Sequence, residues 1–129
     1  MSSVNDLKTA LALGSCRILN LKPARVGGIT ASKKMEEICR VHNMPMWCGG
    51  LLETGIGRAH NVAVATLPGF TLPNDISASD RYFTEDIVRP EFRLNADGTI
   101  TVPTGPGLGV DVVPDKLMKY AARTELFSS

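Results

Sequence analysis

Arg17-Ile-Leu-Asn-Leu-Lys-Pro-Ala-Arg-Val-Gly-Gly28 is the stretch that decides the fold of this chain. Its apolar run Ile18–Leu21 predicts a short buried strand that ends at Lys22, and Pro23 then leads into a glycine-containing turn. In α/β barrels the loops after the parallel strands build the active face, so a lysine at this position is a candidate for chemistry. The alternative is an ordinary surface lysine that ends a strand.

Strands and helices alternate along the first 79 residues. A helix is predicted from Ser3 to Leu13, with Ser3 or Asn5 as its cap and Gly14 as its end. The elements predicted after it are a strand over 18–21, a helix over 30–42, a strand over 44–48 that buries Trp47, a helix over 57–66 and a strand over 70–72. This alternation indicates a parallel sheet with right-handed crossovers.

The alternation stops after Ser79. Residues 85–93 and 99–102 predict two strands around Asn95-Ala-Asp-Gly98, because the Asp-Gly pair is typical of a hairpin turn. Pro114 then opens a last helix, predicted over 116–127. The sequence therefore predicts partial barrel units over residues 1–79 and a separate tail over residues 80–129. Three βα units cannot close a barrel of eight, which indicates a piece of a larger protein.

Length, charge and cysteine content exclude several classes of protein. The 129 residues suffice for one domain but not for a whole barrel of about 250 residues. A net charge of +1 provides no electrostatic basis for binding nucleic acid or an anionic membrane. No apolar run reaches the ~18 residues of a membrane span, and no secretory leader is recognisable. Three cysteines argue against a disulfide framework, so we expect a cytoplasmic protein.

Four blocks of sequence, in a fixed order, carry a family resemblance. They are Asn20-Leu-Lys-Pro-Ala-Arg-Val-Gly-Gly28, the run from Trp47 to Asn61 with Gly49-Gly-Leu-Leu-Glu53 inside it, Leu72–Ser79, and Gly105–Val110. Together they resemble the C-terminal part of the enolase superfamily. Within its muconate-lactonizing subgroup they are most similar to the o-succinylbenzoate synthases and N-acylamino acid racemases. The resemblance implies strands six to eight of a TIM-type (β/α)8 barrel, followed by a tail that returns to a capping domain.

The resemblance also implies a reaction and a role for Lys22. The family removes a proton from the carbon next to a carboxylate, through an enediolate intermediate, with Mg²⁺ and a lysine base. Lys22 matches the sixth-strand lysine. In racemisation this lysine works opposite a second-strand lysine, and in the dehydration that serves menaquinone biosynthesis it stabilises the intermediate electrostatically. The sequence does not separate synthase from racemase.

Eight further residues match positions that line the family's substrate pocket, and each also has a simpler explanation. They are Gly49, Gly50, Leu51, Leu52, Glu53, Asp75, Ile76 and Ser77. The two glycines can form a tight turn after a strand, and the two leucines can pack in the core. The carboxylates of Glu53 and Asp75 can cap or charge a neighbouring helix.

Much of the family's active site has no counterpart in this sequence. The second-strand lysines, the metal ligands of the third to fifth strands and the capping domain are all missing. Magnesium needs several oxygen ligands, so we expect it in the complete enzyme and not on this chain alone. The first hypothesis is therefore a C-terminal fragment that is inactive by itself. Its partners would be the missing N-terminal half of the barrel with the capping domain, and a small carboxylate substrate.

Two other hypotheses come from different classes. In the first, the chain is a non-catalytic assembly module, a half-barrel that forms homo-oligomers or pairs with a missing piece through the unpaired edge of its first strand. In the second, it is a complete small α/β protein of unrelated activity. That hypothesis requires a closed sheet with no exposed edge at Ile18–Leu21.

Overall fold

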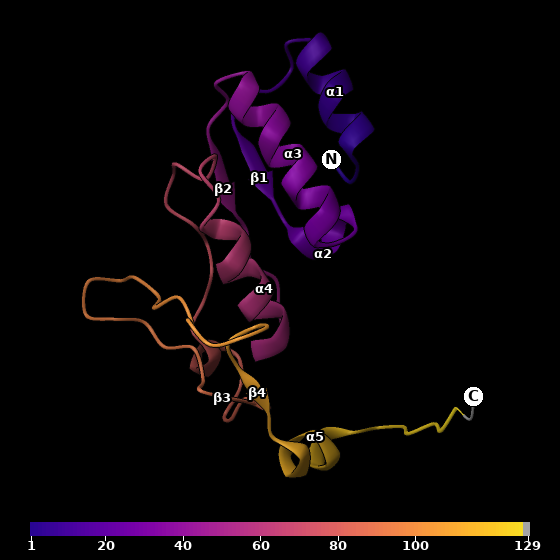
Figure 1. Ribbon diagram of the computed structural model, residues 1–129, viewed down its shortest axis with the longest axis vertical. Coiled ribbons are helices and arrows are strands. Elements are labelled where there is room, and N and C mark those ends of the chain that lie inside the picture. Colours follow the sequence, from indigo (N-terminus) through magenta and orange to yellow (C-terminus); the bar gives the residue numbers. More distant parts are fainter. Residues whose placement is uncertain (128–129) are drawn as a thin grey trace.

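A computed structural model describes residues 1–127 of the chain (Figure 1). Its elements are α1 (Val4–Ala12), β1 (Leu19–Leu21), α2 (Pro23–Val26), α3 (Ile29–Val41), β2 (Met46–Cys48), α4 (Gly55–Ala65), the 3-10 turn η1 (Ser79–Arg81), β3 (Val88–Arg89), β4 (Asp111–Val112) and α5 (Pro114–Tyr120). Helices α1 and α3 pack against each other beside the β1–β2 pair, and the tail with α5 lies at the other end of the molecule. None of the helices in residues 1–127 is long and apolar enough to cross a membrane.

Strands β1 and β2 form a parallel pair, as the alternation of strands and helices predicts. Leu19 lies opposite Met46, Asn20 opposite Trp47, and Leu21 opposite Cys48. The two leucines of β1 are buried while Asn20 between them is exposed, so one face of the pair points into the core and the other is open. Within the described residues the sheet has only these two strands. The closed sheet that a complete small α/β protein of unrelated activity would require does not form.

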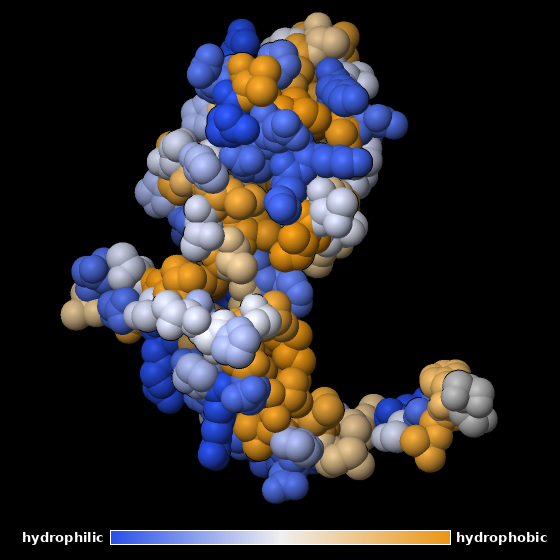
Figure 2. Space-filling model, in the orientation of Figure 1, coloured by the Kyte–Doolittle hydropathy of each residue, from blue (hydrophilic) through white to orange (hydrophobic). Residues whose placement is uncertain are grey.

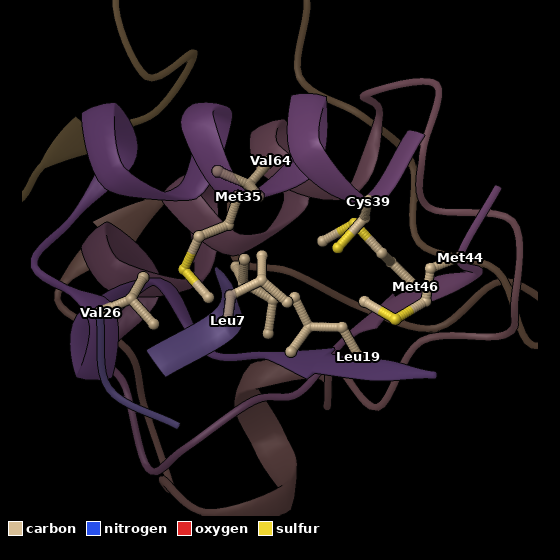
Figure 3. Packing of buried hydrophobic residues seen from close by; sticks show 9 residues of the cluster. Leu7, Leu19, Val26, Met35, Cys39, Met44, Met46 and Val64 are labelled. Carbon is tan, nitrogen blue, oxygen red and sulfur yellow. The ribbon is translucent and has the colours of Figure 1, made fainter. Parts of the chain in front are cut away.

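The main core lies between this pair and helices α1, α3 and α4 (Figure 3). Its buried members are Leu7, Leu19, Leu21, Val26, Met35, Cys39, Met44, Met46 and Val64. Burial of each such side chain stabilises the fold by about 1.5–3 kcal/mol. Trp47 is absent from this cluster, because it is half-buried on the opposite face of β2 from Met46 and Cys48. The expectation that it belongs to the core was wrong.

The helix boundaries follow local signals in the sequence. Ser3 caps α1, since its hydroxyl accepts a hydrogen bond from the backbone N–H of Asp6 at 3.1 Å, and Gly14 follows the helix with a φ of 61°. The expected turn after Lys22 is instead a short helix, α2, with Pro23 at its first position and Gly27 at its end. Helix α4 begins at Gly55, two residues before its predicted start.

Residues 70–72 do not form the predicted third strand. The backbone N–H of Leu72 donates to the carbonyl of Met46 at 3.1 Å, and that of Asp75 donates to Cys48 at 2.9 Å. The donors are three residues apart while their acceptors on β2 are two apart, so the regular alternation of a ladder is lost. The side-chain oxygen of Asn74 accepts a hydrogen bond from the N–H of Cys48 at 2.7 Å. The chain therefore runs along β2 as an irregular strand.

The tail differs most from the prediction. Residues 85–93 contain only the short strand β3, which ends before Pro90 and pairs antiparallel with β4 instead of with residues 99–102. The turn at Asn95 does form, and the N–H of Asn95 donates to Thr99 at 2.8 Å. Helix α5 ends at Tyr120, seven residues before its predicted end, and buries none of its residues. Without an apolar face to bury, the later residues have nothing to hold them in a helix.

A buried ion pair joins the tail to α4. Arg58 Nη1 and Asp86 Oδ2 lie 3.6 Å apart, and their side chains are 1% and 0% exposed. Asp86 also accepts hydrogen bonds from the N–H of Gly55 at 2.8 Å and the hydroxyl of Ser79 at 2.6 Å. A second, smaller core also joins α4 to the tail, with Ala59, Val62 and Phe92 buried in it. The sequence offered no signal for this pair.

Candidate active site

Lys22 lies at the carboxyl end of β1, where it precedes α2. Its ammonium nitrogen donates a hydrogen bond to the carbonyl oxygen of Gly50 at 2.5 Å, and the side chain is partly buried. Because β1 and β2 are parallel and in register, their carboxyl ends meet at one edge of the sheet. The lysine is therefore fixed against the loop that follows β2.

Gly49 and Gly50 allow three segments to meet closely at this edge. A Cβ atom on Gly49 would collide with Asn20 Oδ1 and lie 2.8 Å from the Lys22 ammonium nitrogen. A Cβ atom on Gly50 would lie 2.7 Å from the carbonyl oxygen of Asp75. The same two glycines donate backbone hydrogen bonds to Leu21 at 2.9 Å and to Asp75 at 2.7 Å. The absence of side chains at these two positions thus leaves the space that Lys22, Asn20 and the backbone of Asp75 occupy.

Leu51 and Leu52 extend from the same loop into solvent. Their exposed fractions are 40% and 71%, so the alternative in which they pack in the core is wrong. The loop after Gly50 therefore presents two exposed apolar side chains.

Glu53 turns its carboxylate back toward this loop. Both carboxylate oxygens accept a hydrogen bond from the N–H of Leu51 at 2.8 Å, and one accepts from Asn61 Nδ2 at 2.9 Å. The N-cap of α4 is Thr54, whose side chain makes no capping bond. Glu53 therefore does not cap α4, although it remains near the positive end of the helix dipole.

Asp75, Ile76 and Ser77 point in different directions. Asp75 is exposed and bonded to β2 through its backbone, and it caps no helix, since η1 has Ala78 at its N-cap. Ile76 packs against the smaller core of Ala59, Val62 and Phe92. The Ser77 hydroxyl donates to Tyr82 Oη at 3.2 Å, and this bond lowers the pKa of Tyr82. Only Asp75 of the three lies at the same sheet edge as Lys22.

The charges of Lys22 and Glu53 meet around Cys48. Burial, assisted by the Glu53 carboxylate and opposed by the Lys22 ammonium, raises the pKa of the Cys48 thiol to about 12. The thiol is therefore neutral at ordinary pH and unsuited to be a nucleophile, since the thiolate is the reactive form.

Two asparagines at the site were missed by sequence reasoning. Asn74 holds the extended segment of residues 72–75 against β2, and Asn20 lies over Gly49 beside the lysine. A signal for Asn20 was present, because it stands two positions before Lys22 and alternate residues of a strand share a face.

These residues do not fit a magnesium site by themselves. In residues 1–127 no three or more His, Cys, Asp or Glu side chains are grouped so that they could hold a metal ion. Magnesium prefers six oxygen ligands, usually carboxylates and waters. Glu53 and Asp75 do not provide such a set.

Comparison with known proteins identifies the family of this fold. Residues 1–116 match the family model described as enolase C-terminal domain-like. The chain belongs to this family. A member of the enolase superfamily from Listeria innocua has a solved structure that superposes with a TM-score of 0.92 at 50% identity, over 97% of this chain and 33% of that one. The prediction of an α/β fold that corresponds to the C-terminal part of an enolase-superfamily barrel is confirmed.

The curated relatives of this enolase C-terminal domain-like chain are enzymes. The o-succinylbenzoate synthase of Bacillus subtilis is 52% identical over 126 residues, which cover 98% of this chain and 34% of that protein. The N-succinylamino acid racemase of an Amycolatopsis species is 53% identical over 108 residues, which cover 84% of this chain and 29% of that protein. The chain thus spans about a third of the length of the relatives it matches.

Proposed function

We propose that this chain corresponds to the C-terminal third of an o-succinylbenzoate synthase or N-acylamino acid racemase, with Lys22 as its active-site lysine. The observation that carries the proposal is the position of Lys22 at the carboxyl end of a parallel strand, with its ammonium on the Gly50 carbonyl at 2.5 Å. Relatives of about 50% identity bear both enzyme names, which supports the pair of activities and favours neither.

In the proposed reaction a proton leaves the carbon next to a substrate carboxylate. Lys22 takes or holds this proton at Nζ in the racemase, and its ammonium stabilises the developing negative charge in the synthase. The Gly50 carbonyl orients Nζ, and Gly49 leaves room for it. No step is assigned to magnesium on these residues, since they do not fit a magnesium site.

The substrate would lie on the open face of the β1–β2 edge. Gly49, Gly50 and Asp75 form its floor, Leu51 and Leu52 its apolar wall, and Glu53 fixes the loop between them. We propose that Ile76 and Ser77 contribute through the position of their loop, because their side chains contact the tail.

The remaining parts of the proposal concern partners and surroundings. The chain would be inactive alone and would need the barrel strands and capping domain that make up the rest of its relatives. A cytoplasmic location fits the free thiols of Cys16, Cys39 and Cys48. The boundary between barrel units and tail would lie near Ser79.

A complementation assay tests this proposal. The purified chain is mixed with the N-terminal two thirds of the Bacillus subtilis synthase, and magnesium-dependent loss of the succinyl-cyclohexadiene carboxylate substrate and racemisation of an N-succinyl amino acid are measured. We expect activity only in the mixture, abolished by Lys22→Ala and retained with Lys33→Ala, a lysine exposed on α3. Turnover by the chain alone, or by the Lys22→Ala mixture, would contradict it.

A second candidate function is self-association, and the open edge of β1 is the observation that favours it. Within the described residues β1 pairs only with β2, and Ile18 beside its free edge is 52% exposed. Unpaired strand edges are templates for pairing with another chain. Light scattering over a range of concentrations tests this: a dimer that Ile18→Lys dissociates supports it, and a monomer at high concentration counts against it.

A further inference from the structure

Two polar side chains converge at Gly49, one from β1 and one from the residue that follows this strand. Asn20 Oδ1 and the Lys22 ammonium nitrogen both occupy the space that a side chain at position 49 would fill. The parallel register explains this, since Asn20 lies opposite Trp47 and the N–H of Gly49 donates to Leu21. Asn20, Lys22 and Gly49 therefore share the open face, while Leu19 and Leu21 point into the core.

The hydrogen bonds of Lys22 are incomplete in this arrangement. An ammonium group has three N–H donors, and among the described residues only the Gly50 carbonyl accepts one. The side-chain oxygen of Asn20 has two acceptor lone pairs and stands over the same glycine. A second acceptor on the other side would hold Nζ in place more firmly than the single bond to Gly50 does, and the remaining N–H would then keep one direction.

We propose that Asn20 is a positioning residue for Lys22. Its side-chain oxygen accepts a second N–H of the ammonium, directly or through one water, so that the third points to the open face of the sheet. Glycine is required at position 49 because a side chain there would collide with both groups. This inference rests on the proposed function, in which Lys22 acts on the substrate, but it concerns a contact within this chain.

Competitive labelling of the 129-residue chain tests the contact without any enzymatic activity. Trace acetic anhydride modifies free amines, and peptide mass spectrometry gives the rate at Lys22 relative to Lys33 and Lys34 on α3. We expect Asn20→Leu to raise this relative rate at least threefold, because the ammonium loses an acceptor. Asn20→Asp should lower it about threefold, because a carboxylate binds an ammonium more strongly than an amide does.

The controls separate positioning from folding. Asn5→Leu, on the exposed side of α1, should leave the relative rate unchanged, and Asn20→Asp should melt at the temperature of the unaltered chain because position 20 is exposed. If Asn20→Leu fails to fold, the relative labelling rate of Asn20→Asp decides by itself whether the inference stands. A relative rate that neither substitution changes, or that both change in the same direction, would overturn the inference.

The labelling and the complementation assay fail independently. If the Asn20 variants alter the labelling while the mixture has no activity, the contact stands and the proposed function fails. If the mixture is active and the labelling does not respond to Asn20, the proposed function stands without this positioning residue. In an active mixture, we further expect Asn20→Leu to lower kcat about tenfold with little change in KM.

Discussion

Residues 1–72 and residues 73–127, which include the tail, are stabilised in different ways. The first part contains the nine buried residues of the main core, which come from α1, β1, α3, β2, α4 and the segments beside them. Among the described residues after 72, only Ala78, Val88 and Phe92 are buried apolar residues, and Asp86 joins this part to α4 through its pair with Arg58. In Figure 2 a continuous apolar patch lies over the lower part of the molecule, where the tail and α4 are found. The comparison indicates that the tail has no core of its own: its apolar residues pack on Ala59 and Val62 of α4, and the buried Arg58–Asp86 pair adds a charge contact to the same helix.

Removal of the Asp86 carboxylate should have the largest effect. Asp86→Ala leaves the Arg58 guanidinium buried without a counter-charge, and such a loss destabilises by about 3–5 kcal/mol. We expect amides of residues 79–112 to exchange with deuterium much faster while those of α3 stay protected. The control is Asp80→Ala, because the Asp80 side chain is 64% exposed and lies 3.8 Å from Arg93. Equal loss of protection in α3 and the tail would show that the two parts unfold together.

A cavity in the main core should destabilise the chain slightly less than Asp86→Ala does. It should loosen the first part of the chain and not the tail. Leu21 is 1% exposed, and Leu21→Ala should lower the free energy of unfolding by about 2–4 kcal/mol in a urea titration. Leu13→Ala is the matched control, because Leu13 is 75% exposed and should change the stability by less than about 0.5 kcal/mol. A Leu21→Ala chain as stable as the unaltered one would argue against this core.

Acid should release α5, with the smallest effect on the whole molecule. Hydrogen bonds from Lys119 and Tyr120 lower the pKa of the Glu85 carboxyl from 4.5 to about 2. A lowered pKa means that the contact stabilises α5 fully above pH 4.5 and is lost as the pH falls toward 2. Amide exchange in α5, compared at pH 5 and pH 2.5, should show this release. In the Glu85→Gln variant the amides of α5 should already exchange fast at pH 5. If their exchange in this variant still rose between pH 5 and pH 2.5, a group other than Glu85 would cause the release.

The same contrast explains how much could be predicted from the sequence. Apolar periodicity predicted α1, β1, α3, β2 and α4 because these elements bury a regular face. The meeting of Lys22 with Gly50 followed from parallel strands alone, because their carboxyl ends share an edge. The tail has no such regular apolar face. Pro90 ends β3, and an extra residue between Leu72 and Asp75 interrupts the third ladder that β propensity had favoured. The pairing of Arg58 with Asp86 joins residues far apart in the sequence, so no local sequence pattern predicts it.

Trp47 gives this molecule an optical property that none of its other residues provides. It is the single tryptophan of the chain, and it lies half-buried on the open face of β2, opposite Asn20. Tryptophan emits at shorter wavelength when water is removed from its ring. Whatever covers this face, whether a second copy, the rest of a barrel or a substrate, must therefore shift the emission to the blue. The chain therefore carries its own fluorescent reporter on this face, and the emission of Trp47 can be used to follow the assembly of the site without any added dye.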